Sequence, residues 1–324
     1  MNNSTLQPPA SNMVEGRDFF ITLMVINAFS GFLATVLNLL IIVTLIKTPS
    51  LRTPSNILIL NLSITDFGVG ALVQPVYSIV IFAHMNKVLL RSQFVLNPVT
   101  MILSCASLLT ITVITVDRFL ALLLSLRYQE IVTKRRTSKV VIMIWTFSVS
   151  LPCILLAIFS FFKKIKDYDV VVVQINNFLF LSLFLLNIAL MLKISSIINR
   201  HSAQIQVQQQ AMNAQPGAAG NIKRSVNMMY FILGTFFLCY FPCICFRIIA
   251  YFSLSKIAFV WQVVSNVVFT ILCMNSSINP IIYFWRIPDM RNAALQLLRS
   301  IRRNNNNIND NNNNRDAEND VYVL

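Results

Sequence analysis

Residues 94–124 read FVLNPVTMILSCASLLTITVITVDRFLALLL, and this stretch decides the fold. A helix needs about twenty apolar residues in a row to cross the hydrocarbon core of a bilayer, and the stretch exceeds that length. Near its end stands Asp117-Arg118-Phe119. A charged side chain within a spanning helix is costly unless it faces protein or water, so the charged pair indicates a functional position.

The composition of the whole chain is that of a membrane protein. Its 324 residues are 56% hydrophobic and only 12% charged, which excludes an ordinary soluble protein of this size. Apolar runs long enough to span a membrane predict an all-α membrane protein, a seven-transmembrane helix bundle. The runs are Phe19–Ile46, Ser55–Ala83, Phe94–Leu124, Val140–Phe162, Val171–Ile198, Ile222–Phe252 and Ile257–Phe284. From Phe284 to Arg299 apolar and basic residues alternate at helical spacing, which predicts a short amphipathic helix after the seventh span.

The distribution of Lys and Arg predicts the orientation of the chain. These residues are enriched in alternate loops, so we expect a plasma-membrane protein with its N-terminus outside and its C-terminus inside the cell. The formal net charge of +14 is then mainly a topology signal, and nucleic-acid binding is not expected. We expect an extracellular tail over 1–18, the seven-transmembrane domain with its eighth helix over 19–299, and a disordered, asparagine-rich cytoplasmic tail over 300–324. Overlapping Asn-x-Ser/Thr motifs predict glycosylation of Asn2 and Asn3.

Isolated polar residues and prolines mark the other spans. Asp66 is a lone carboxylate in the second span, where it needs an ion, a proton or hydroxyl and amide partners. Asn38 in the first span has two open interpretations, helix packing and a functional role. Pro75 predicts a kink in the outer half of the second span, and Pro242 predicts a pivot in the sixth.

The six cysteines all fall inside apolar runs, so they indicate neither a disulfide framework nor a zinc site outside the bilayer. The sequence contains no nucleophile–base pair or metal-ligand cluster outside packing positions. We therefore do not expect an enzyme.

Taken in order, the motifs resemble those of rhodopsin-like (class A) G-protein-coupled receptors. They are Asn38, the segment Asn61–Asp66, Asp117-Arg118-Phe119, Trp145, the segment Phe237–Pro242 and Asn279-Pro280-Ile281-Ile282-Tyr283. The resemblance covers about Phe19 to Arg299. It implies a receptor that binds an extracellular ligand in the outer helix bundle and activates a heterotrimeric G protein by outward movement of the sixth helix. It also implies membrane lipids and arrestin as candidate partners.

The resemblance assigns roles to individual residues. Those implied in G-protein coupling and activation are Asp117, Arg118, Phe119, Tyr240, Pro242, Asn279, Pro280 and Tyr283, with Tyr240 standing where the family usually has tryptophan. Asp66, Ser107, Asn275 and Asn279 look like the family's sodium pocket, and their oxygens suit a hard cation. An allosteric sodium ion is the only candidate cofactor.

Several positions depart from the family pattern. Gln93 stands where the family usually has a cysteine at the outer end of the third span, and the second outer loop has no cysteine either. The fifth span lacks the usual proline and tyrosine. These departures look like the melanocortin branch or, more loosely, the melanocortin–adenosine–cannabinoid group. No acidic residue precedes Lys223-Arg224 to lock Arg118, which predicts appreciable ligand-free signalling.

The sequence limits the chemical class of the ligand mainly by excluding some classes. Thr100 stands where amine receptors of the family carry an aspartate, and Cys273 where opsins carry the retinal lysine, so neither a monoamine nor retinal is expected. The candidate ligand-binding residues are Asn97, Thr100, Met101, Ser104, Arg247, Gln262, Ser265 and Asn266. One cation in a polar, otherwise neutral set favours an anionic or neutral small molecule, a lipid or a short acidic peptide.

Two other functions stay open at this point. A secondary transporter could use Asp66 and the Asp117-Arg118 pair as ion sites, although the internal repeats and matching broken helices typical of transporters are not found in the sequence. A receptor-shaped partner that forms heteromers without signalling is left open by the missing outer cysteines and by Tyr240.

Overall fold

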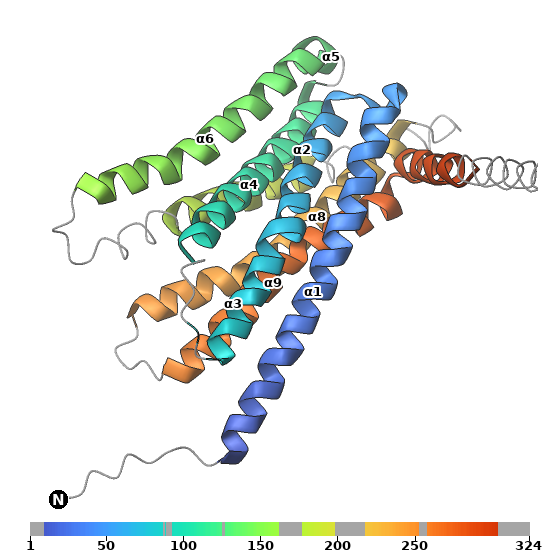
Figure 1. Cartoon of the computed structure of the whole chain (residues 1–324). Coiled ribbons are helices and arrows are strands. Elements are labelled where there is room, and N and C mark those ends of the chain that lie inside the picture. The colour runs from blue at the N-terminus through green and yellow to red at the C-terminus, as the bar shows by residue number, and fades with distance from the viewer. Residues whose placement is uncertain are drawn as a thin grey trace, which may run out of the picture.

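The computed structural model of the chain describes residues 10–86, 88, 93–124, 127–161, 177–197, 218–252 and 258–303. Within these ranges the chain is helical and contains no β-strand. Figure 1 shows the long helices running side by side as one bundle, with the helix over 288–303 extending sideways from one end of it. We call that end, which also holds the short helix α5, the inner end.

The elements follow the chain in the order expected for a bundle of antiparallel neighbours. The long helices are α1 (Ala10–Lys47), α2 (Pro54–Gly68), α3 (Gln74–Met85), α4 (Gln93–Leu124), α6 (Lys134–Phe161), α8 (Ala218–Phe252), α9 (Ala258–Arg286) and a helix over Asn177–Ile197. Short elements are the 3₁₀ turn η1 (Pro49–Leu51), the π-helical turn η2 (Val69–Val73) between α2 and α3, and α5 (Tyr128–Ile131).

Within the part of the chain that the structure describes, six helical segments are long and apolar enough to cross a membrane. They are Arg17–Lys47, Pro54–Ala83, Leu96–Leu124, Lys134–Leu155, Asn177–Ile197 and Val260–Arg286. The sixth span expected from the sequence corresponds to α8, which contains a shorter apolar segment, Gly234–Ala250. The prediction of an all-α, multi-pass membrane protein is confirmed, and six of its seven expected spans are present by length and hydropathy.

Three boundaries differ from those expected. α1 begins at Ala10, so part of the predicted extracellular tail is helical. α6 begins at Lys134 rather than Val140, because Thr133 Oγ1 accepts a hydrogen bond from the backbone N–H of Arg136 and caps the helix there. The last helix continues to residue 303, so residues 300–303, expected to be disordered, are helical.

The second span is interrupted just before Pro75. A proline inside a helix donates no hydrogen bond and its ring clashes with the carbonyl four residues earlier. The chain accommodates it with the π-helical turn Val69–Val73, and a regular helix resumes at Gln74. The disturbance expected at Pro75 is therefore found in the turn that precedes it.

Two glycines bring α1 and this π-helical turn into backbone contact. A Cβ atom on Gly70 would lie 2.8 Å from Ala34 Cβ and 2.8 Å from the carbonyl oxygen of Gly31. Small residues at such a crossing let two membrane helices approach closely. The Gly31–Gly70 contact fixes the second span against the first.

A buried network of polar side chains lies beside that contact. Gln74 Nε2 donates to Asn27 Oδ1 and to Ser30 Oγ, both at 3.2 Å, and Asn27 Nδ2 donates to Thr270 Oγ1 at 3.3 Å. The side chains of Gln74 and Asn27 are fully buried. The network ties α1 to the second span on one side and to α9 on the other.

A buried amide side chain joins the third and fifth spans. Asn187, fully buried, donates from Nδ2 to Thr112 Oγ1 at 2.8 Å and accepts from Thr115 Oγ1 at 3.1 Å. Two hydroxyl groups on one face of α4 therefore bind the helix over Asn177–Ile197, which contains no proline.

Candidate functional site

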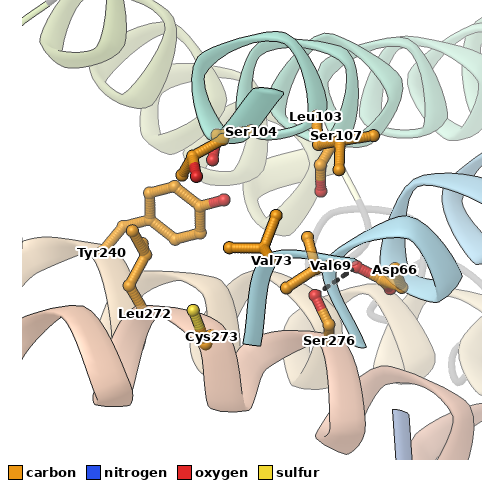
Figure 2. Close-up of a pocket in the computed structure, with 11 residues that line it drawn as sticks. Asp66, Val69, Val73, Leu103, Ser104, Ser107, Tyr240, Leu272, Cys273 and Ser276 are labelled. Carbon is orange, nitrogen blue, oxygen red and sulfur yellow. Dashed lines mark hydrogen bonds between the residues drawn. The ribbon is translucent and has the colours of Figure 1, made fainter. Parts of the chain in front are cut away.

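A small cavity with both polar and apolar walls lies where the second, third, sixth and seventh spans meet (Figure 2). Its walls come from α2, η2, α4, α8 and α9. The lining residues are Asp66, Val69, Val73, Thr100, Leu103, Ser104, Ser107, Tyr240, Leu272, Cys273 and Ser276. The cavity brings together Asp66 and Ser107 of the predicted sodium set with Thr100 and Ser104 of the predicted ligand set.

Asp66 is buried at this cavity and is bonded to α9 through both carboxylate oxygens. Ser276 Oγ donates to Oδ1 and Asn279 Nδ2 donates to Oδ2, each at 2.8 Å, and Figure 2 shows the bond from Ser276. Ser276 was missing from the predicted sodium set. Its spacing of three residues from Asn279 places both side chains on one helical face, which was the available signal.

Several buried oxygens around Asp66 lack a hydrogen-bond partner. Among the described residues this holds for Ser107 Oγ, Asn275 Oδ1 and Asn279 Oδ1. Unpaired buried acceptors require an explanation, and hydroxyl, amide and carboxylate oxygens are the ligands that hard cations prefer. The residues thus fit a sodium ion chemically, although neither Asn275 nor Asn279 lines the cavity.

Asp117 is held at the inner end by three partners from three elements. Ser55 Oγ donates to Oδ2 at 2.9 Å, Tyr128 OH donates to Oδ1 at 2.6 Å, and Arg118 NH2 lies 3.2 Å from Oδ2. Burial raises the pKa of Tyr128, and its bond to Asp117 raises it further. The sequence predicted the Asp117-Arg118 pair but neither Ser55 nor Tyr128, because both lie outside the third span.

The other predicted activation residues lie on α4, α8 and α9. Tyr283 is fully buried in the inner hydrophobic core, and Phe119 packs against that core. Tyr240 is also buried, and its ring stacks on Phe236 with centroids 3.9 Å apart. Pro242 and Pro280 lie within α8 and α9.

Two further motif residues link neighbouring helices. Asn38 Nδ2 donates to the carbonyl oxygen of Ser276 at 3.0 Å, beside the Asp66 site. Asn61 Nδ2 donates to Thr110 Oγ1 at 2.7 Å and its Oδ1 accepts from Trp145 Nε1 at 2.8 Å. Asn61 therefore connects α2, α4 and α6, and Asn38 has a packing role between α1 and α9.

The predicted ligand residues are only partly brought together. Asn266 Oδ1 accepts a hydrogen bond from Tyr77 OH at 2.5 Å, away from the cavity lining. Neither Asn97, Met101, Gln262 nor Ser265 lines the cavity. The side chain of Arg247 lies outside the described residues, as do Asn2 and Asn3.

The order of spans and polar contacts matches a known family. Residues 37–283 match the family described as the 7 transmembrane receptor (rhodopsin family). The chain belongs to this family. As a rhodopsin-family receptor it is not an enzyme, and its general partners are a heterotrimeric G protein and an extracellular ligand.

Similar receptors cover most of the chain. G-protein coupled receptor 12 of Homo sapiens is 26% identical over 272 residues, which span 82% of this chain and 77% of that receptor. Adenosine receptor A3 of Ovis aries is 26% identical over 86% of this chain and 90% of its own length. Histamine H2 receptor of Cavia porcellus is 29% identical over 76% of this chain and 71% of its own length.

Proposed function

We propose that this rhodopsin-family receptor activates a heterotrimeric G protein when the inner end of α8 moves outward about Pro242. The three-partner arrangement around Asp117 carries the proposal. Arg118 would be restrained by Asp117 at rest and would meet the G protein once α8 moves. The same movement would rearrange the other residues implied in activation, which are Phe119, Tyr240, Asn279, Pro280 and Tyr283.

The proposed orientation places the inner end in the cytoplasm of a cell whose plasma membrane the chain crosses. The N-terminal segment, with Asn2 and Asn3 glycosylated, would then be extracellular. The tail after residue 303 would be cytoplasmic, and arrestin would be a further partner there. Arginines and exposed leucines on the helix over 288–303 support contact with membrane lipids.

The proposed ligand is an anionic or neutral molecule. Thr100 replaces the aspartate that an amine would require, which argues against a ligand like the one named for the histamine relative. The adenosine relative is named for a neutral molecule, which suits the polar, uncharged side chains of Thr100 and Ser104 at the cavity. For an anionic agonist, Arg247→Ala should weaken potency strongly, and unchanged potency would remove the anionic proposal.

The proposed cofactor is a sodium ion bound at Asp66. Ser107 and Asn279 of the predicted set would also hold it, and Ser276 is added to that set. When bound, the ion would supply a positive charge that compensates the buried carboxylate. Asn275 would assist only from the adjoining turn of α9. The site would favour the resting packing of α2 against α9.

The decisive test is nucleotide exchange on a panel of G proteins in membranes that contain the chain. We expect exchange above that of control membranes, lost in Arg118→Ala and retained in Arg291→Ala, whose side chain is exposed on the last helix. Absence of exchange with every G protein, before and after ligand screening, would favour the non-signalling heteromer partner. Sodium-driven solute uptake into vesicles that contain the chain would favour a transporter.

A further inference from the structure

The guanidinium group of Arg286 lies against aromatic rings from two helices. Its central carbon is 4.2 Å from the ring centroid of Phe231 on α8 and 4.0 Å from that of Trp285 on α9. The two rings meet edge to face, with centroids 5.2 Å apart and an interplanar angle of 74°. One cation thus bridges the N-terminal half of α8 and the C-terminal end of α9.

The surroundings of Arg286 favour this contact over an ion pair. The Nε atom is buried and has no hydrogen-bond partner within the described part of the chain. A guanidinium within about 6 Å of an aromatic face is attracted by the ring quadrupole, and arginine stacks on rings better than lysine does. Arg286 is also the last residue of α9, where the helix dipole favours a cation.

The sixth span offers Arg118 no acidic partner. The whole of α8, Ala218–Phe252, contains neither Asp nor Glu. Among the labelled helices, α8 packs most extensively on α9 and touches α4 only lightly. A restraint on the inner end of α8 is therefore to be sought on α9, not on the helix that carries Arg118.

We propose that Arg286 is a positioning residue that holds the inner end of α8 in its resting place through Phe231. This inference rests on the proposed function, because it assumes that movement of α8 is the signal. This differs from a restraint in which an acidic residue of the sixth span holds Arg118. Here the moving helix α8 supplies a neutral ring, and the seventh span supplies the cation. The contact breaks when Phe231 leaves the guanidinium face, so outward movement of α8 would cost this interaction.

Four variants of the full chain in lipid nanodiscs test the contact. Arg286→Gln removes the cation, Phe231→Leu removes the ring, the double variant removes both, and Arg286→Lys keeps a charge without the planar fork. Matched controls are Arg291→Gln on the last helix and Phe178→Leu on the helix over Asn177–Ile197, since both side chains are exposed. Each sample is compared by amide hydrogen exchange without G protein and by basal nucleotide exchange with it.

We expect Arg286→Gln and Phe231→Leu each to raise amide exchange at the inner end of α8 and basal nucleotide exchange roughly two- to fivefold. The double variant should show no further increase, because both changes remove one interaction. Arg286→Lys should restore part of the protection, and the two controls should match wild type.

Two results would overturn the inference. One is amide exchange in α8 of Arg286→Gln equal to that of Arg291→Gln; the other is a uniform increase over all helices, which would mean a general loss of packing. A wild-type chain that activates no G protein would refute the proposed function instead, and amide exchange alone would then decide whether Arg286 holds α8.

Discussion

Tyr128 OH donates a 2.6 Å hydrogen bond to Asp117 Oδ1 from a short helix outside the span that carries Asp117. With Ser55 on the other carboxylate oxygen, it fixes the orientation of Asp117 toward Arg118. Hydrogen bonds to a charged group contribute about 1.5–3 kcal/mol. We expect Tyr128→Phe to loosen this arrangement and to raise basal nucleotide exchange several-fold. Ser55→Ala should act in the same direction, and wild-type exchange in both variants would contradict the role given to these bonds.

The raised pKa of Tyr128 gives a dependence of stability on pH. Because the folded state holds the phenol proton more tightly, the stabilisation is complete below the ordinary pKa of 10.0 and is lost as the pH rises above it. Thermal unfolding in detergent should show wild type losing stability above about pH 10 more steeply than Tyr128→Phe. Parallel curves for the two proteins would contradict this assignment.

Sodium should stabilise the receptor through Asp66. A ligand that binds only the folded state raises its stability by RT ln(1 + [L]/Kd). The melting temperature should be higher in sodium chloride than in choline chloride of equal ionic strength, and the difference should vanish in Asp66→Asn. Asp289→Asn, which changes an exposed carboxylate on the last helix, should keep it. Equal melting temperatures in the two salts for wild type would count against the ion.

Asn187 should contribute measurably to the packing of the fifth span. Asn187→Leu removes its bonds with Thr112 and Thr115 on α4. Hydrogen bonds between membrane helices contribute about 0.6–2 kcal/mol. We expect a melting temperature lower by a few degrees, with Asn292→Leu at an exposed position as the control. No difference between the two variants would show that the amide is dispensable.

A methyl group should be tolerated at one glycine and not at another. In Gly70→Ala the new Cβ atom would lie 2.8 Å from Ala34 Cβ, and overpacking of this kind costs about 1–3 kcal/mol. Gly234 has nothing within 4 Å of such an atom, so Gly234→Ala should be neutral or stabilise by up to about 1 kcal/mol. Melting temperatures and yields of the two variants check the contrast; equal effects would refute the close contact.

Features that depend on one helix at a time were predictable from the sequence. Span lengths follow from the apolar runs, and the pairing of Asp117 with Arg118 follows from their adjacency. The need of Asp66 for amide and hydroxyl partners follows from the cost of a buried charge, and Asn279 is such a partner.

Features that depend on how two helices are rotated against each other were not predictable. Nothing in the spacing of Gln74 and Asn27 indicates that they meet, and the same holds for Asn187 and the threonines of α4. A polar residue in a span indicates that it has hydrogen-bond partners, but a single sequence does not show which helix provides them. The contact of Arg286 with Phe231 joins residues in different spans for the same reason.

The π-helical turn at Val69–Val73 has a consequence for numbering across the family. The turn contains one residue more than a turn of regular helix. Each residue of a regular helix advances by about 100° around the axis. Every side chain beyond the turn therefore points where the neighbouring residue would point in an uninterrupted helix. Beyond this turn, Tyr77 is buried and its hydroxyl donates a hydrogen bond to Asn266 Oδ1. Counting from Asp66 toward Met85, as though the span were regular, would therefore assign the wrong residues to the interior of the bundle.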